Sequence, residues 1–220
     1  DMEIKNISLN MYSFGYSAGF IRPDKAFEKV ITLEELIKES RKLGLAGIEF
    51  PFDRYFDKHC YAEGVNFLKK LSQENVKFFL DFENLNVDLL KKVIPELASL
   101  GIRVSRIKMD QTRKTIYGGN RHMMVNFEET KKVFISKLKN LASLLKEYDF
   151  TLAIENHQDL HSLELMDIIQ SIDPNHLGIN WDVGNSISCL DTVDSFYQNT
   201  KEAIKNVHLK DYKVYSSRNG

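Results

Sequence analysis

The sequence has few cysteines and no long hydrophobic run. Cys60 and Cys189 stand far apart and form neither a CxxC pair nor a zinc-ligand pattern, which favours two ordinary thiols in a reducing cytoplasm over a disulfide framework. No segment approaches the roughly 20 apolar residues that a membrane helix needs, and the first residues carry no signal-peptide pattern. We therefore expect a soluble, cytoplasmic protein that does not bind a membrane.

The chain also lacks an excess of charge of either sign. Its 30 basic and 31 acidic residues leave a net charge of −1, so no sequence-wide basic field attracts nucleic acid. No GxGxxG or GxxxxGK[ST] motif follows the first predicted strand, which argues against a nucleotide-binding fold. With no Pro-, Gly- or Ser-rich linker, the 220 residues are predicted to form one domain over 1–220.

Strand-like and helix-like periodicity alternates along the whole chain. The first helix has a capping-box start at Thr32 and Glu35 and a stop signal at Gly44. Pro95 implies a kink or a boundary within the third helix. Predicted strands cover 7–12, 47–50, 76–82, 104–109, 152–157, 178–185 and 206–211, and predicted helices cover 33–43, 62–74, 87–100, 127–148, 163–172 and 193–204.

This alternation predicts a parallel sheet, because parallel strands need crossover helices. A (β/α)8 TIM barrel is the leading fold, and a doubly wound sheet is the alternative. In the long helix over 127–148, an apolar stripe is expected to face the core, and it comprises Val133, Phe134, Leu138, Leu141 and Leu145. Seven strands are visible, so we expect the eighth strand and the closing helices to lie beyond Gly220.

Three of the predicted strands end in groups that bind metals: Glu155, Asp182 and His208. Parallel barrels place their chemistry at the carboxyl ends of the strands, and unpaired charges are costly on an inward face. Two carboxylates and one imidazole suit Mn²⁺, Mg²⁺ or Co²⁺ and are compatible with Zn²⁺. The alternative interpretation is that the carboxylates are exposed strand-end charges and that the histidine is structural.

The motifs Ile154-Glu-Asn-His157, Gly178-Ile-Asn-Trp-Asp-Val-Gly-Asn185 and Val207-His-Leu-Lys-Asp211, with Gly47-Ile-Glu49, carry a family resemblance. The chain resembles the xylose isomerase-like TIM-barrel superfamily, in particular its sugar phosphate isomerase/epimerase branch. The resemblance implies a divalent metal held by Glu155, Asp182, His208 and a final Glu from the eighth strand. Many relatives carry a histidine where this chain has Asn185.

Four further side chains are candidate substrate ligands. His157 and Lys210 lie one strand period beyond Glu155 and His208, toward the barrel mouth, where they could hold a substrate oxygen or steady negative charge. Asn185 could hydrogen-bond a hydroxyl group, and Glu49 lies on an otherwise apolar strand. The alternative interpretation is that His157 and Lys210 are solvent-exposed residues at the rim of the barrel and that Glu49 is an ordinary charged residue at a strand end.

The resemblance implies a metal-dependent sugar isomerase or epimerase that removes a proton next to a carbonyl and passes through an enediolate. Glu155 would be both a ligand and the catalytic acid or base. The alternatives are a lyase that dehydrates a keto-polyol or cleaves a keto-glycoside, an endonuclease IV-like phosphodiesterase, and a metal-free binding relic. Sparse histidines and a neutral net charge argue against the phosphodiesterase. The expected partner is a small sugar, and relatives commonly pair through barrel faces as homo-oligomers.

Overall fold

The computed structural model describes residues 6–15, 17, 31–56, 60–109, 121, 124 and 126–210. The chain divides into two compact units, 1–105 and 106–220. Across them, seven strands alternate with helices, and this is the arrangement of a partial (β/α)8 barrel. The prediction of a single domain over 1–220 stays a prediction.

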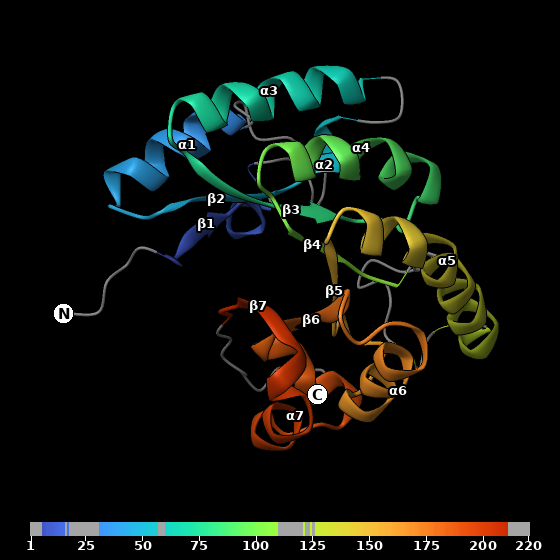
Figure 1. The fold of residues 1–220 in the computed structure, drawn as a ribbon. Helices are drawn as coiled ribbons and strands as arrows, with labels where there is room; N and C mark the ends of the chain where they lie inside the picture. Colours follow the sequence, from blue (N-terminus) through green and yellow to red (C-terminus); the bar gives the residue numbers. More distant parts are fainter. Residues whose placement is uncertain are drawn as a thin grey trace, which may run out of the picture. The chain divides into compact units, whose positions relative to one another are not determined.

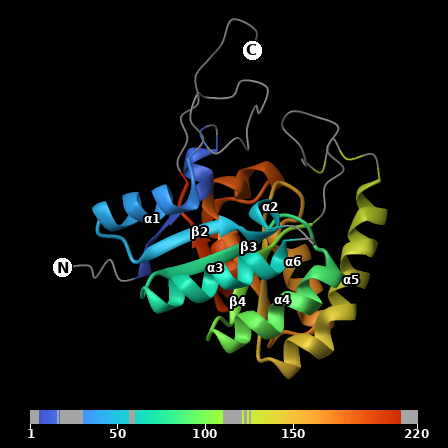
Figure 2. The same ribbon diagram turned by 90° about the horizontal axis from the view of Figure 1, so that it is seen from above.

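In the first unit, strands β1, β2 and β3 are parallel and pair in chain order. Glu49 of β2 lies opposite Asn10 of β1 and Phe79 of β3. The helices α1, α3 and α4 lie along one side of these strands (Figures 1 and 2). The elements are β1 (Ser8–Asn10), η2 (Met11–Phe14), α1 (Leu33–Lys42), β2 (Gly47–Pro51), α2 (Phe52–Tyr55), α3 (Tyr61–Gln73), β3 (Lys77–Phe82) and α4 (Val87–Ser99). The strand β4 (Val104–Ile107) spans the boundary between the units.

Local sequence signals correctly predict where α1 begins and ends. The Thr32 side chain accepts a hydrogen bond from the Glu35 backbone N–H, and the Glu35 carboxylate accepts one from the Thr32 backbone N–H, so the predicted capping box of α1 is confirmed. Gly44 follows the helix with φ of +68°, which is the left-handed conformation that glycine tolerates.

Pro95 does not end a helix. It lies inside α4, which is continuous from Val87 to Ser99, so a boundary at this residue is wrong. The helix buries one apolar face that includes Leu90, Val93, Ile94 and Leu97. Burial of such a face contributes more than the single hydrogen bond that proline removes, so packing keeps the helix continuous.

In the second unit, strands β5, β6 and β7 are also parallel and pair in chain order. Their helices flank them on the outside (Figure 1). The elements are α5 (Phe127–Glu147), β5 (Thr151–Glu155), α6 (Ser162–Ile172), β6 (Leu177–Asp182), η5 (Val183–Cys189), α7 (Val193–Thr200), η6 (Lys201–Ala203) and β7 (Ile204–His208). All three strands are shorter than predicted at their carboxyl ends.

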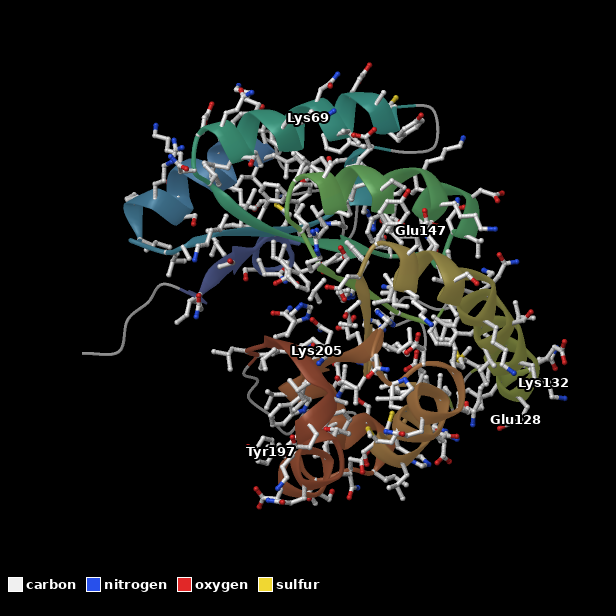
Figure 3. The ribbon with its side chains drawn as sticks, in the orientation of Figure 1. Lys69, Glu128, Lys132, Glu147, Tyr197 and Lys205 are labelled. Carbon is white, nitrogen blue, oxygen red and sulfur yellow. The ribbon has the colours of Figure 1, made fainter. Side chains whose placement is uncertain are left out.

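In the long helix α5, the predicted burial of the apolar stripe is confirmed for four of its five residues. Phe134, Leu138, Leu141 and Leu145 are buried, but Val133 is 47% exposed. At about 100° per residue, the four buried side chains lie within about 60° of one another around the helix, and Val133 lies about 100° from Phe134, outside this stripe. The prediction for Val133 is therefore wrong. The outer face carries charges such as Glu128 and Lys132, which project away from the strands (Figure 3).

No helix among the residues that the structure describes is long and apolar enough to cross a membrane.

Candidate metal centre

The candidate ligands are the last residues of three neighbouring parallel strands. Glu155 ends β5, Asp182 ends β6 and His208 ends β7. Because parallel strands present their carboxyl ends at one edge, the three side chains are delivered to one place. Asp182 and His208 are direct partners in the β6–β7 register. The sheet itself therefore brings the last two residues together.

The structure places one ligand atom from each of Glu155, Asp182 and His208 within 4.8 Å of the others. The Nδ1 atom of His208 lies 3.6 Å from Oε1 of Glu155. Glu155 is 2% exposed and Asp182 is 5% exposed, so water can solvate neither carboxylate fully. Ligand atoms about 2.1 Å from Mg²⁺ in octahedral geometry lie about 3 to 4 Å apart. The donor set and its spacing thus fit a divalent ion after small side-chain adjustments.

Arg106 is a partner of Glu155 that the sequence reasoning missed. Its Nη2 atom donates a hydrogen bond to Oε2 of Glu155, and both side chains are 3% exposed. Burial raises the pKa of the Glu155 carboxyl, but electrostatic interactions with Arg106 and then with His157, together with a hydrogen bond from His208, outweigh it and hold the pKa well below its usual range. An arginine within the short strand β4 was the sequence feature that could have indicated this ion pair.

The surroundings of Asp182 shift the pKa of its carboxyl in the opposite direction, upward. Burial raises the pKa of its carboxyl, the Lys210 ammonium lowers it and the Glu155 charge raises it. The Oδ2 atom of Asp182 accepts a hydrogen bond from Lys210 Nζ at 3.1 Å, and Oδ1 accepts one from the Gly184 backbone N–H at 3.1 Å. Two neighbouring buried carboxylates repel each other, so a cation between them would stabilise both in their ionised form.

Asn185 and Lys210 lie together beside Asp182. Lys210 Nζ donates to Oδ1 of Asn185 at 2.9 Å as well as to Asp182. Within the described part of the chain, Nδ2 of Asn185 has no hydrogen-bond partner, although the residue is only 2% exposed. A buried amide N–H without a partner is costly and is suited to an oxygen atom from outside the chain.

His157 lies near Glu155 for a different reason from the one that strand alternation predicts. The strand β5 ends at Glu155, and the His157 backbone N–H donates to the Glu155 carbonyl at 3.0 Å, which makes a tight turn. The strand-period argument is therefore wrong for this residue, and for Lys210, which lies beyond the end of β7. Burial lowers the pKa of the imidazole to about 3, against the attraction of Glu155 and with the help of Lys108, Arg106 and Lys210. His157 is neutral near pH 7.

Glu49 lies on β2 in the first unit and is 5% exposed. Its predicted part in substrate binding remains a prediction.

A family model described as a xylose isomerase-like TIM barrel matches residues 37–219. The chain belongs to this family. The match covers most of the sequence, including all three strands that end in candidate ligands, and it confirms the resemblance that the strand-end motifs indicated.

Among curated proteins, the chain is 22% identical over 149 residues to 3-oxo-isoapionate decarboxylase of Pectobacterium atrosepticum. This alignment covers 66% of the chain and 50% of the relative, so the chain spans about half the length of that enzyme.

Solved structures of the same fold include two informative neighbours. The 3-keto-D-glucoside 4-epimerase of E. coli aligns with a TM-score of 0.65 and 12% identity over 81% of this chain and 74% of that one. A xylose isomerase-like TIM barrel protein of Mycobacterium smegmatis, solved in complex with magnesium, aligns with a TM-score of 0.65 and 16% identity over 94% of this chain and 74% of that one. At these identities the likeness establishes the fold alone.

Proposed function

We propose that this chain carries the divalent-metal site of a sugar, or sugar phosphate, isomerase or epimerase. The observation that supports the proposal is the cluster of Glu155, Asp182 and His208, whose ligand atoms come within 4.8 Å at the carboxyl ends of adjacent strands. Two nearly buried carboxylates and one imidazole match the ligands that Mn²⁺, Mg²⁺ and Co²⁺ accept. A bound divalent ion would polarise the carbonyl and hydroxyl oxygens of the sugar and so ease removal of the proton between them.

The surrounding side chains would bind and orient the sugar. The unpartnered Nδ2 of Asn185 would donate to a hydroxyl or carbonyl oxygen, and Lys210 would stabilise negative charge that develops on oxygen. The neutral imidazole of His157 would donate or accept a hydrogen bond without adding charge. The low pKa of Glu155 suits a ligand, which must be ionised, better than a proton acceptor.

A lyase is the second candidate, and the similarity to a decarboxylase favours it. Decarboxylation of a 3-keto acid, like proton removal next to a carbonyl, leaves an electron pair that is stabilised as an enolate. The same oxygen-polarising site would therefore serve both reactions, and the fate of the enolate would distinguish them. It is protonated on carbon in an isomerase, an epimerase or a decarboxylase, and it expels a leaving group in a dehydratase.

The first experiment measures metal binding. Purified protein, stripped with EDTA, is titrated with Mn²⁺, and Asp182→Asn and His208→Gln are compared with the wild type. We expect each variant to weaken binding at least about tenfold, because each removes a direct ligand or its charge. Asp173→Asn is the matched control, since it alters another Asp–His pair, Asp173 with His176 at 2.9 Å, outside the cluster. Full-length wild-type protein that binds no Mn²⁺, Mg²⁺ or Co²⁺ would overturn the proposal and favour a metal-free relic.

The second experiment follows the reaction. The metal-loaded protein is incubated in D₂O with ketoses, their phosphates and 3-keto sugar acids, and products are read by NMR and mass spectrometry. Deuterium at the carbon next to the carbonyl, with no loss of mass, would support the isomerase or epimerase. Release of CO₂ or of water would identify the lyase instead. Glu155→Gln should abolish either activity, and retained activity would remove Glu155 from the mechanism.

A further inference from the structure

The backbone ladder between β5 and β6 stops before it reaches one of the candidate ligands. The last registered pair is Glu155 with Asn180, so Asp182 lies two residues beyond the ladder. On the other side, Asp182 pairs directly with His208 through the β6–β7 ladder. Main-chain pairing therefore relates His208 to Asp182, but it does not relate Glu155 to Asp182. A further contact beyond the end of the ladder can fix that second separation.

The side chain of Asn156 makes this contact. Its Oδ1 atom accepts a hydrogen bond from the Asp182 backbone N–H at 2.7 Å, and its Nδ2 atom donates to the Asp182 carbonyl at 3.0 Å. A carboxamide has the same donor and acceptor as a peptide group, so the side chain replaces the missing rung of the ladder. Both backbone polar groups of Asp182 are held by one side chain.

The amide is itself held in a buried network. Asn156 is 1% exposed, and its Nδ2 atom also lies 3.4 Å from Oγ of Ser186. That hydroxyl group is 3.2 Å from Nε1 of Trp181, which donates to it. Ser186 is also 1% exposed. A buried amide with partners on both its oxygen and its nitrogen has one favoured orientation, because rotation would break several bonds at once.

We propose that Asn156 is a positioning residue that fixes the distance between Glu155 and Asp182. The proposal rests on the metal-dependent function above. Asn156 follows Glu155 directly in the chain and binds the backbone of Asp182 with its side chain, so it connects the two carboxylates rigidly. Its amide binds the backbone of Asp182 and the hydroxyl group of Ser186. Its effect is on how well the two carboxylates fit one ion.

The test measures metal binding by the EDTA-stripped protein with Mn²⁺ alone and records the visible spectrum with Co²⁺ alone. Asn156→Ala removes the amide and leaves room for water to satisfy the backbone of Asp182. Asn156→Gln keeps the amide but displaces it by one methylene. Groups that orient a metal ligand typically change metal affinity 10- to 100-fold. We expect Mn²⁺ affinity to fall by about that factor in Asn156→Ala and the Co²⁺ spectrum to change in both variants.

Asn199→Ala is the matched control. Asn199 also donates from its amide to a serine, Ser162 Oγ at 2.9 Å, but it belongs to α7 and not to the strands that end in the candidate ligands. Its affinity and spectrum should equal those of the wild type. Folded Asn156→Ala with wild-type affinity and spectrum would overturn the positioning role, as would failure of both Asn156 variants to fold. Absence of metal binding in the wild type would instead defeat the proposed function, and the role of Asn156 with it.

Discussion

Replacement of Arg106 by methionine should strongly destabilise the metal-free protein. Methionine keeps most of the apolar volume and removes the guanidinium group that is paired with Glu155. Both side chains are only 3% exposed, so solvent cannot take the place of the lost charge. Removal of one partner from a buried ion pair typically costs about 3–5 kcal/mol, because the other charge is left buried. We expect a loss of this size in the free energy of unfolding.

The assay is equilibrium urea denaturation of the EDTA-treated protein at pH 7, followed by far-UV circular dichroism. The double variant Arg106→Met with Glu155→Gln should recover much of the loss, since it also removes the buried carboxylate charge that Arg106 pairs with. Arg41→Met is the matched control because Arg41 pairs with Glu74 at 3.4 Å on the surface, with side chains 58% and 42% exposed. It should change the free energy of unfolding by less than about 1 kcal/mol.

Two results would refute this reasoning. The first is an Arg106→Met variant whose stability lies within about 1 kcal/mol of the wild type, as for a surface pair. The second is a double variant that is no more stable than the single one, which would mean that the loss comes from packing around the arginine and not from the charge of Glu155. An unchanged denaturant slope is needed for either comparison.

Three other perturbations test the fold away from the metal centre. Burial raises the pKa of Glu164, but hydrogen bonds from Arg121 and Lys131 outweigh it and lower the pKa to about 2. The contribution of the Glu164 carboxylate to stability is therefore present above about pH 4.5 and is lost as the pH falls through 2. Glu164→Gln should flatten the acid unfolding curve across that window, and a curve as steep as that of the wild type would disprove this contribution. Phe134→Ala should lower the free energy of unfolding, measured by urea denaturation, by about 3–5 kcal/mol, because Phe134 is buried. Val133→Ala should change it by less than about 0.5 kcal/mol, because Val133 is exposed, and equal losses would contradict the placement of the two residues on α5. Gly47→Ala should lower the thermal midpoint markedly, because its Cβ would lie 1.9 Å from a backbone oxygen of β3, and an unchanged midpoint would count against that close approach.

Several features of this protein follow from local sequence alone. The Thr32–Glu35 capping box and the Gly44 stop define α1 because the hydrogen bonds and dihedral angles involved lie within a few residues. Alternating periodicity predicts the seven strands because each must bury apolar side chains between crossover helices. The residue types at three strand ends likewise predict the ligand set, because charged groups after apolar strands have few alternatives to a shared partner.

Other features depend on partners that are distant in the sequence. The pairing of Arg106 with Glu155 joins β4 to β5, and the bond from Asn156 to Asp182 joins β5 to β6. No pattern within either segment specifies such a contact. The placement of His157 shows the same limit, since alternation holds only as long as the strand continues, and β5 ends at Glu155. Where a strand ends depends on hydrogen bonds to its neighbours.

The sequence by itself therefore determined which segments form strands and which chemical groups they carry near their carboxyl ends, because periodicity and residue type are properties of each segment. Only the tertiary structure decided that Arg106 holds one oxygen of Glu155, that Asn156 continues the β5–β6 ladder, and that Asn185 and Lys210 lie beside Asp182. Those contacts depend on the register between strands and on side-chain packing, and both arise only when the segments assemble.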